Sequence, residues 1–211
     1  MPASVLIVDD HYIVRSGLEI VVKETIGMDV NIDFAKDGDD AIDKIKKKKY
    51  NLCICDINMP DTDTLQVVKQ MLVIQPLLKI LVLSINPKEI FASFYIKCGV
   101  YGYVYKGDIG KELREALKCI YAGEKYLGNI KTVESDLSNP FARLSEREFV
   151  VMHMLLRGYG LQETADILHL SKSATNTYKN RIFQKLSISS VIELSALAKT
   201  FNIANNDSSL Y

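Results

Sequence analysis

The sequence predicts two domains: an α/β domain built on a five-stranded parallel sheet with helices on both faces, and a smaller all-α domain of four short helices. The first prediction rests on five apolar runs that alternate with segments of helical periodicity in residues 1–124, an order typical of parallel sheets. The second rests on short amphipathic segments with tight connections in residues 143–206. A length of 211 residues is sufficient for two such domains.

The predicted strands are short apolar runs at residues 5–8, 30–34, 52–55, 80–83 and 101–105. The run at 52–55 contains only apolar and small residues, as expected for a strand covered on both faces. Pro60 prevents this strand from continuing and fixes a turn. The residues that end the strands are, in order, Asp9 with Asp10, Phe34, Asp56, Ser84 and Lys106. Four of the five strands thus deliver a polar side chain to the carboxyl edge of the sheet, where ligands bind in open α/β folds.

The predicted helices between the strands have apolar residues at helical spacing. The sets are Val14, Leu18, Val21 and Val22; Ala41, Ile42 and Ile45; Leu65, Val68 and Leu72; and Leu113, Ala116, Leu117, Ile120 and Tyr121. A further helix begins near Pro87, which suits a first helical turn, and ends at Gly99. The lysine run at 46–49 invites a nucleic-acid interpretation, but a solvated helix C-terminus, favoured by the helix dipole, explains it better.

A stretch with Gly, Asn, Ser and Pro at residues 125–142 is the predicted linker to the second domain. Beyond it, Ser145 with Glu148 and Ser190 with Glu193 have the spacing of capping boxes, which mark helix starts. The middle pair of helices, at 164–168 and from residue 171, has the arrangement of a helix-turn-helix. We expect the second of these helices to bury Tyr178, Ile182 and Leu186, and residues 207–211 to form a tail.

The composition excludes few function classes. The 26 basic and 26 acidic residues balance, although residues 143–211 hold 8 basic against 6 acidic ones. No stretch approaches the roughly 20 apolar residues of a membrane span, and the N-terminus lacks a signal-peptide pattern, so we expect a cytoplasmic protein with no membrane partner. The cysteines form no C-x-x-C pair, and we expect two of them to be small buried hydrophobes. They are Cys53 and Cys55, with Cys98 and Cys119 elsewhere.

The strand-end residues suit phosphoryl chemistry. A lone strand-end aspartate most often caps a loop or a helix, but Asp9, Asp10 and Asp56 together can hold Mg²⁺, which prefers oxygen ligands. An aspartate oxygen can attack phosphorus and form an acyl phosphate. Lys106 and the Ser84 hydroxyl are suited to bind the oxygens of the transferred group. We therefore predict that Asp56 accepts a phosphoryl group beside a magnesium ion.

Two other interpretations of this edge stay open. A structural ion cluster would use the same side chains. A hydrolase is the second, because residues 61–64 superficially resemble the D-x-D-x-T of haloacid-dehalogenase-like phosphatases. That motif should follow its strand directly, whereas here it lies beyond Pro60, inside the loop.

The segment 172–186 has the composition of a DNA-recognition helix. It contains no acidic residue, and its basic side chains, which can meet DNA phosphates, are Lys172, Lys179, Arg181 and Lys185. Asn176, Thr177 and Asn180 lie opposite its apolar face. Asn pairs with adenine edges and Thr meets the thymine methyl group. The alternative is a merely solvated helix face.

With these residues in register, the chain resembles two-component response regulators of the NarL/FixJ class over residues 3–203. In the first domain the resemblance rests on spacing: Ser84 lies 28 residues beyond Asp56 and Lys106 another 22 beyond Ser84, with Asp9, Asp10, Met59 and Pro60 in place. In the second domain it rests on Leu144, Ser145, Arg147, Glu148, Gly158, Ala165, Leu168, Ser171, Ile182, Lys185 and Leu186.

The resemblance implies a doubly wound, flavodoxin-like receiver domain at 1–124 and a LuxR-type helix-turn-helix domain at 143–206. It implies that a histidine kinase phosphorylates Asp56, that Ser84 and Lys106 bind the phosphoryl group, and that Tyr103 changes rotamer with Ser84. The implied Mg²⁺ ligands are Asp9, Asp10, Asp56 and the backbone carbonyl of Asn58. The protein would then be no enzyme beyond its own phosphoryl transfer and dephosphorylation.

The resemblance also implies binding to double-stranded promoter DNA as a homodimer. The family's base-contacting positions fall on Asn176, Thr177 and Asn180. The dimer surface falls on the last helix, at Val191, Leu194, Ser195 and Ala198.

The sequence departs from the family pattern at several positions. Thr64 stands where the family usually has Gly, and Ile85 follows the hydroxyl residue where a small residue is usual, which we expect to narrow access to the phosphorylation pocket. Gly160 replaces a capping Ser, a modest loss. In the recognition helix the usual Val, Lys and His are replaced by Thr175, Asn176 and Tyr178. Fewer cations predict weaker and less salt-dependent DNA binding.

The function that the sequence predicts is a DNA-binding transcription regulator controlled by phosphorylation of Asp56. One alternative is a DNA-binding regulator whose receiver acts without phosphorylation, which Thr64 and Ile85 motivate. Another is a protein–protein signalling module that no longer binds DNA.

Overall fold

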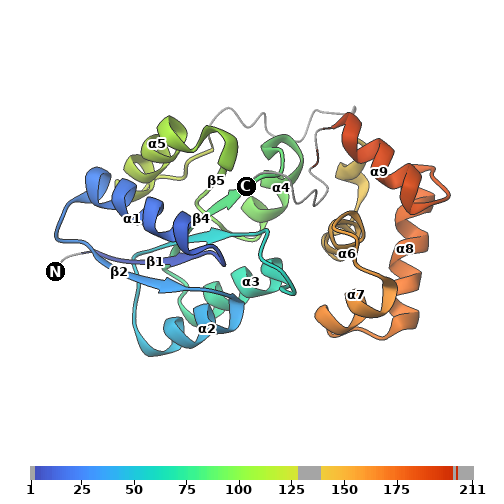
Figure 1. The fold of residues 1–211 in the computed structure, drawn as a ribbon, viewed down its shortest axis with the longest axis horizontal. Helices are drawn as coiled ribbons and strands as arrows, with labels where there is room; N and C mark the ends of the chain where they lie inside the picture. The colour runs from blue at the N-terminus through green and yellow to red at the C-terminus, as the bar shows by residue number, and fades with distance from the viewer. Residues whose placement is uncertain (1–2, 128–138, 202, 204–211) are drawn as a thin grey trace. The chain divides into compact units, whose positions relative to one another are not determined.

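The computed structural model describes residues 3–127, 139–201 and 203 (Figure 1). The chain divides into two compact units, Met1–Lys131 and Thr132–Tyr211. Residues 128–138 of the predicted linker and the predicted tail at 207–211 lie outside the described residues. The described ends of the linker belong to the units on either side. The Tyr126 N–H donates to the Tyr101 carbonyl at 2.7 Å, and Phe141 is buried against Phe201, with ring centroids 5.5 Å apart.

The first unit contains a five-stranded parallel sheet in the order β2-β1-β3-β4-β5, which confirms the predicted α/β fold. Its strands are β1 Ser4–Val8, β2 Asn31–Ala35, β3 Leu52–Asp56, β4 Lys79–Ser84 and β5 Gly102–Tyr105. Every residue of β3 is buried. This strand runs one residue further than predicted because Asp56 itself pairs in register with Leu83.

Helices cover both faces of this sheet. They are α1 Tyr12–Ile26, α2 Gly38–Lys47, α3 Thr64–Ile74, α4 Lys88–Lys97 and α5 Ile109–Tyr121. α1 and α5 pack over one set of alternate strand residues, which includes Ile7, Ile54 and Leu81. α3 lies on the other face, where the sulfur atoms of Cys53 and Met71 are 3.9 Å apart, and Tyr95 of α4 packs beside Tyr103 of β5, with ring centroids 6.3 Å apart. Cys53 and Cys55 are buried, as predicted. Cover on both faces accounts for the continuous apolar strands.

The carboxyl ends of the strands meet at one edge of the sheet. Val8 pairs with Cys55, so that Asp9 and Asp56 follow at the same level of neighbouring strands. Ser84 ends β4 and pairs with Tyr105, the residue before Lys106. The parallel register thus brings side chains from four separate segments to a common place.

The second unit consists of four α-helices in its described residues, α6 Glu146–Leu156, α7 Leu161–Ile167, α8 Lys172–Leu186 and α9 Val191–Thr200, preceded by the short 3-10 helix η2 Pro140–Arg143. The capping box of α6 is confirmed, because Ser145 Oγ accepts from the Glu148 N–H and the Glu148 carboxylate accepts from the Ser145 N–H. The predicted second capping box is wrong. Ser190 does cap α9, but the Glu193 carboxylate turns to the N–H and hydroxyl of Ser189.

The buried face of α8 also differs from the prediction. Thr175, Ile182 and Leu186 are buried, whereas Tyr178 is only half-buried. Thr175 lies nearer the centre of this face, and its hydroxyl is satisfied by the Ser171 carbonyl at 3.2 Å. The polar residue Thr175 therefore occupies a core position, whereas the pattern of apolar residues had favoured Tyr178, three residues further along α8. Across the described ranges, no helix is long and apolar enough to cross a membrane.

Two charged residues in the first turn of α6, Arg147 and Glu148, hold the helices together. Arg147 Nη2 donates to the Leu168 carbonyl at the end of α7, at 2.7 Å. Glu148, which is 3% exposed, accepts from Lys185 Nζ of α8 at 2.6 Å. At the start of α7, Gly160 has no capping side chain, although Glu163 accepts its N–H at 2.7 Å. Arg147 and Glu148 thus serve the packing of the domain.

A buried histidine makes the stability of the second unit depend on pH. Burial, helped by the charge of Arg157, lowers the pKa of His153 to about 3. In the unfolded chain its pKa returns to the usual value near 6.5. Below that value the unfolded chain binds a proton that the folded one excludes, so stability falls as the pH falls from about 6.5 toward 3.

We predict that this group alone reduces the free energy of unfolding by about 2 kcal/mol between pH 7 and pH 5. His153→Gln, which cannot take up the proton, should lose correspondingly less over the same interval. Denaturant unfolding of the full chain, followed by circular dichroism, measures both. Equal pH dependence in the two proteins would show that His153 is not the responsible group.

Candidate functional site

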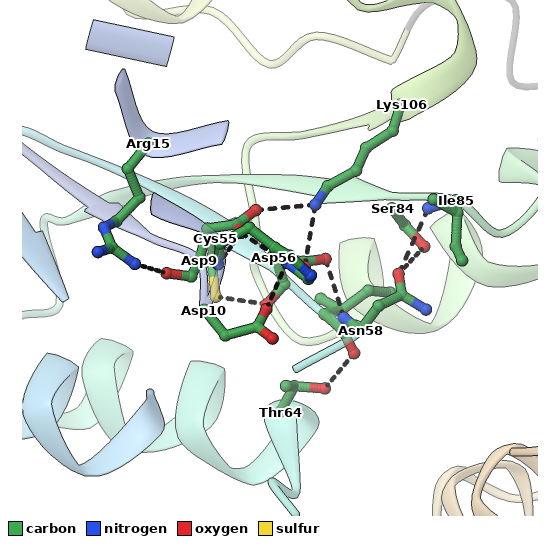
Figure 2. Close-up of polar contacts among 12 residues, drawn as sticks. Asp9, Asp10, Arg15, Cys55, Asp56, Asn58, Thr64, Ser84, Ile85 and Lys106 are labelled. Atoms are coloured by element: carbon green, nitrogen blue, oxygen red, sulfur yellow. Dashed lines mark hydrogen bonds and ion pairs between the residues drawn. The ribbon is translucent and has the colours of Figure 1, made fainter. Parts of the chain in front are cut away.

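The candidate site lies at the carboxyl edge of the sheet, where one lysine is shared by two buried aspartates (Figure 2). Lys106 Nζ is 2.8 Å from Asp9 Oδ2 and 2.9 Å from Asp56 Oδ2. Asp9 is fully buried and Asp56 is 2% exposed. Asp10 follows Asp9 and is partly exposed. The structure thus brings together the aspartates and the lysine that the sequence singled out.

The charges in this cluster depend on one another. Burial raises the pKa of Asp56, the Lys106 ammonium opposes that effect, and the Asp9 charge adds to it. For Lys106, burial alone would lower the pKa, but Asp56 and Asp9 raise it, so the ammonium stays charged. Three carboxylates around one ammonium still leave an excess of negative charge, which a divalent cation would relieve.

Each oxygen of Asp56 has a defined partner. Oδ2 contacts Lys106, and Oδ1 accepts the backbone N–H of Asn58 at 2.9 Å. Asp9 is fixed in the same way, because its Oδ1 accepts the His11 N–H at 2.8 Å. Its backbone carbonyl accepts from Arg15 Nη1 at 2.6 Å. The carboxylates are therefore held in place before any ligand binds.

The donor set fits a magnesium ion. Ligand atoms of Asp9, Asp10 and His11 lie within 4.8 Å of one another. Asp10 Oδ1 is buried and accepts no hydrogen bond from the described residues, although His11 Nδ1 lies 3.0 Å away. A buried carboxylate oxygen without a donor is costly unless a cation satisfies it. His11 was not among the site residues predicted from the sequence, and its position directly after the acidic pair is the one signal that could have indicated it.

Ser84 lies in a hydrogen-bond network beside Asp56. Its hydroxyl is buried, donates to Asn58 Oδ1 at 2.9 Å and accepts the Asn86 N–H at 2.9 Å. The Ile85 N–H also points to Asn58 Oδ1, at 3.3 Å, and the Ile85 side chain is 37% exposed. A phosphoryl group on Asp56 would therefore compete with the Asn58 side chain for the Ser84 proton.

Tyr103 is connected to Ser84 through the backbone of Asn86. The Tyr103 ring is fully buried, and its hydroxyl donates to the Asn86 carbonyl at 2.9 Å. Asn86, which the sequence analysis did not identify, thus bonds Ser84 through its N–H and Tyr103 through its carbonyl. A shift of Ser84 would therefore displace Asn86 and, through it, Tyr103.

The residues predicted to contact DNA divide into two groups on α8. Lys172, Thr177, Asn180 and Arg181 are exposed, and Asn176 and Lys179 are half-buried. Lys185 is different, because its ammonium binds the Glu148 carboxylate of α6 and also donates to the Arg143 carbonyl at 3.2 Å. The structure therefore gives Lys185 a place in the packing of the domain. Sequence spacing could not reveal this pair, since the two residues are 37 positions apart.

The predicted dimer surface on α9 is only partly available. Val191 is exposed and Ser195 is half-buried, but Leu194 and Ala198 are fully buried in their own domain. The neighbouring Ile192 is 81% exposed. Two of the four residues of the predicted surface, Leu194 and Ala198, thus face the core, because residues four positions apart lie on the same side of a helix.

An α/β domain with buried aspartates and a lysine at its carboxyl edge, joined to a helix-turn-helix domain, defines the class of DNA-binding response regulators. The family model described as Response regulator receiver domain matches residues 5–118. The model described as Bacterial regulatory proteins, luxR family, matches residues 142–198. The chain therefore belongs to the response regulators that join a receiver domain to a LuxR-type DNA-binding domain, and the predicted resemblance is confirmed.

Curated relatives match nearly the whole chain. It is 32% identical over 202 residues to Response regulator GacA of Pseudomonas syringae pv. syringae (strain B728a), an alignment that covers 92% of this chain and 94% of the relative. It is 29% identical over 210 residues to Response regulator UvrY of Escherichia coli (strain K12), with 96% of each chain covered.

Solved structures of the RcsB response regulator share the fold. One from Salmonella typhimurium has a TM-score of 0.79 at 27% identity and covers 95% of this chain and 99% of that one. RcsB from Salmonella enterica serovar Typhimurium, bound to promoter P1flhDC in the presence of the phosphomimetic BeF3-, has a TM-score of 0.82 at 24% identity, with 95% and 100% covered.

We predict that Lys185→Met destabilises the protein by about 1–3 kcal/mol, because it leaves the buried Glu148 carboxylate without its cation. Although burial alone would raise the pKa of Glu148, the hydrogen bonds from Lys185 and Ser145 hold this pKa below its usual value. Lys172→Met, at an exposed lysine of the same helix, should change stability by less than about 0.5 kcal/mol. Denaturant unfolding compares the two variants. The assignment of Lys185 to packing is refuted if both unfold like the wild type.

Proposed function

We propose that Asp56 accepts a phosphoryl group from the histidine of a partner kinase, and that this modification controls DNA binding by the second domain. The observation that supports Asp56 most directly is the shared Lys106 ammonium, 2.9 Å from Asp56 Oδ2 and 2.8 Å from Asp9 Oδ2. In the reaction an Asp56 oxygen forms a bond to phosphorus while the bond from phosphorus to the donor nitrogen breaks. The receiver itself promotes only this transfer and the later hydrolysis of its own acyl phosphate.

Mg²⁺ is the cofactor that these residues are suited to hold. Asp9, Asp10, Asp56 and the Asn58 carbonyl would supply its oxygen ligands, with His11 beside them. When bound, the ion supplies positive charge to the carboxylates and to the incoming phosphoryl oxygens. Lys106 is already beside Asp56 and would move one hydrogen bond from the carboxylate to a phosphoryl oxygen.

Ser84 would transmit the effect of the phosphorylation of Asp56 to the rest of the domain. Its hydroxyl would exchange Asn58 Oδ1 for a phosphoryl oxygen, and the hydrogen bonds of Asn86 would carry the shift to Tyr103. A charge added between Ser84 and Lys106 in this way biases a two-state domain.

The second domain would place α8 in the major groove of double-stranded promoter DNA. Asn176, Thr177 and Asn180 would read bases, while Lys172, Lys179 and Arg181 would meet phosphates. Lys185 is left out of this set because Glu148 holds it. A homodimer on DNA would use the side of α9 that carries the exposed Val191 and Ile192 and the half-buried Ser195.

We predict that the wild type gains one phosphoryl group when incubated with a small phosphodonor and Mg²⁺, and that Asp56→Asn gains none. Intact-mass spectrometry measures the adduct. Asp61→Asn is the matched control, since Asp61 has a left-handed backbone (φ 49°) that Asn also tolerates. An adduct that persists in Asp56→Asn would exclude this aspartate. A wild type that takes up no phosphoryl group yet binds DNA would favour a receiver that acts without phosphorylation.

We predict that Asn180→Ala weakens binding to a duplex selected from a random pool by about 5- to 150-fold, with its salt dependence unchanged, because a base contact is lost. Arg181→Ala should instead weaken binding to all duplexes and reduce the salt slope by about one unit, because a phosphate contact is lost. Fluorescence anisotropy at several salt concentrations separates these effects, with Lys199→Ala as the control, because Lys199 is an exposed lysine outside both α8 and the proposed dimer residues Val191, Ile192 and Ser195. The absence of any salt-dependent binding would instead favour a protein–protein module.

A further inference from the structure

Thr64 stands where the family usually has Gly, and its side chain takes part in the hydrogen bonding next to Asp56. It is the first residue of α3 and is 5% exposed. Its hydroxyl donates to the Ile57 carbonyl at 3.2 Å (Figure 2) and lies 3.3 Å from the Tyr95 hydroxyl. Ile57 directly follows Asp56, so the side chain of Thr64 is bonded to the backbone of residues 57–63, the phosphoacceptor loop that connects β3 to α3.

Tyr95 brings α4 into the same network. Its side chain is 4% exposed and projects from the buried side of α4, with Phe91 and Phe94 nearby in the chain and also buried. Because the single Thr64 proton is directed to the Ile57 carbonyl, Tyr95 is the donor in the pair of hydroxyls. Burial raises the pKa of Tyr95, which keeps the phenol protonated and able to donate.

Two routes therefore join the phosphoacceptor loop to α4. One runs from Ile57 through Thr64 to Tyr95. The other runs from Ser84 through Asn86 to Tyr103, whose ring centroid is 6.3 Å from that of Tyr95. Both routes end at Tyr95, on a helix that ends only two residues later, at Lys97. A glycine at position 64 could supply only the second route.

We propose that Thr64 and Tyr95 are positioning residues that tie α4 to the phosphoacceptor loop, so that α4 responds to phosphorylation through a hydroxyl pair. The inference rests on the proposed function of Asp56 and adds the segment that receives its signal. Neither residue touches the Asp56 carboxylate, so the chemistry of phosphoryl transfer does not require them. Removal of either hydroxyl breaks the first of the two routes from the loop to α4, and removal of the Thr64 hydroxyl also leaves the buried Tyr95 hydroxyl without its acceptor.

The test separates uptake of the phosphoryl group from the response of α4. Thr64→Val keeps the shape of the side chain without its hydroxyl, Tyr95→Phe removes the other hydroxyl, and Thr64→Ser restores a hydroxyl at position 64. Each full-length variant is treated with a small phosphodonor and Mg²⁺. Intact mass then gives the extent of phosphorylation, and hydrogen exchange gives the change in protection of residues 88–97.

We expect phosphorylation close to the wild-type extent in all variants. The phosphorylation-dependent change in α4 exchange should fall roughly 2- to 30-fold in Thr64→Val and in Tyr95→Phe. The double variant should lose no more than either single variant, because both remove the same contact. Thr64→Ser should respond like the wild type, which a purely steric role of Thr64 would not produce.

The proposed coupling is overturned if α4 in Thr64→Val and Tyr95→Phe responds to phosphorylation as it does in the wild type. It is also overturned if the losses of the two single variants add in the double variant. A wild type that takes up no phosphoryl group is a different result, since it removes the proposed function of Asp56 and the coupling with it.

Discussion

The receiver domain depends on one electrostatic arrangement, the Lys106 ammonium held between the buried carboxylates of Asp9 and Asp56. Buried carboxylates are unfavourable unless they are paired. The lysine satisfies one oxygen of each, and backbone N–H groups of His11 and Asn58 satisfy the others. The order of the parallel strands makes this possible, because β1 and β3 are neighbours and β5 delivers Lys106 to the same edge. Because its charged side chains are held in place, this site is suited to bind a cation and an anion together, as Mg²⁺ and a phosphoryl group would require.

The surroundings of this pair explain how a charge at Asp56 can act at a distance. Ser84 is held by the Asn58 side chain, and Asn86 links it to Tyr103. Thr64 adds a second link, to Tyr95 of α4. Most of these contacts are buried, so a shift of one partner is passed to the next by close packing. In the second domain, charged residues act differently: Glu148, Arg147 and Lys185 hold helices to each other. The ion pair between Glu148 and Lys185 therefore helps to hold together the domain that exposes the polar face of α8.

The sequence was sufficient to predict the strands, their parallel direction and the meeting of Asp9, Asp56 and Lys106 at one edge of the sheet. The reason is physical: apolar runs of strand length that alternate with helices leave few topologies, and parallel strands all end at one edge. What it could not predict were contacts that depend on side-chain direction. Asn86 acts through its backbone, Lys185 meets a glutamate 37 residues away, and Glu193 turns to Ser189 although its spacing suits Ser190. Likewise, the resemblance assigned residues 191–198 of α9 to a dimer surface, but Leu194 and Ala198 lie on the side of the helix that faces the core.

The central claim, that Asp56 and not Asp9 is the carboxylate that is modified beside Lys106, is tested most directly by locating the acyl phosphate. Reduction of the phosphorylated wild type with borohydride converts an aspartyl phosphate to homoserine, and peptide mass spectrometry then finds the converted residue. We expect conversion at Asp56 alone, with Asp9 and Asp10 unchanged. Conversion at either of those two residues, or at an aspartate away from the sheet edge, would contradict it.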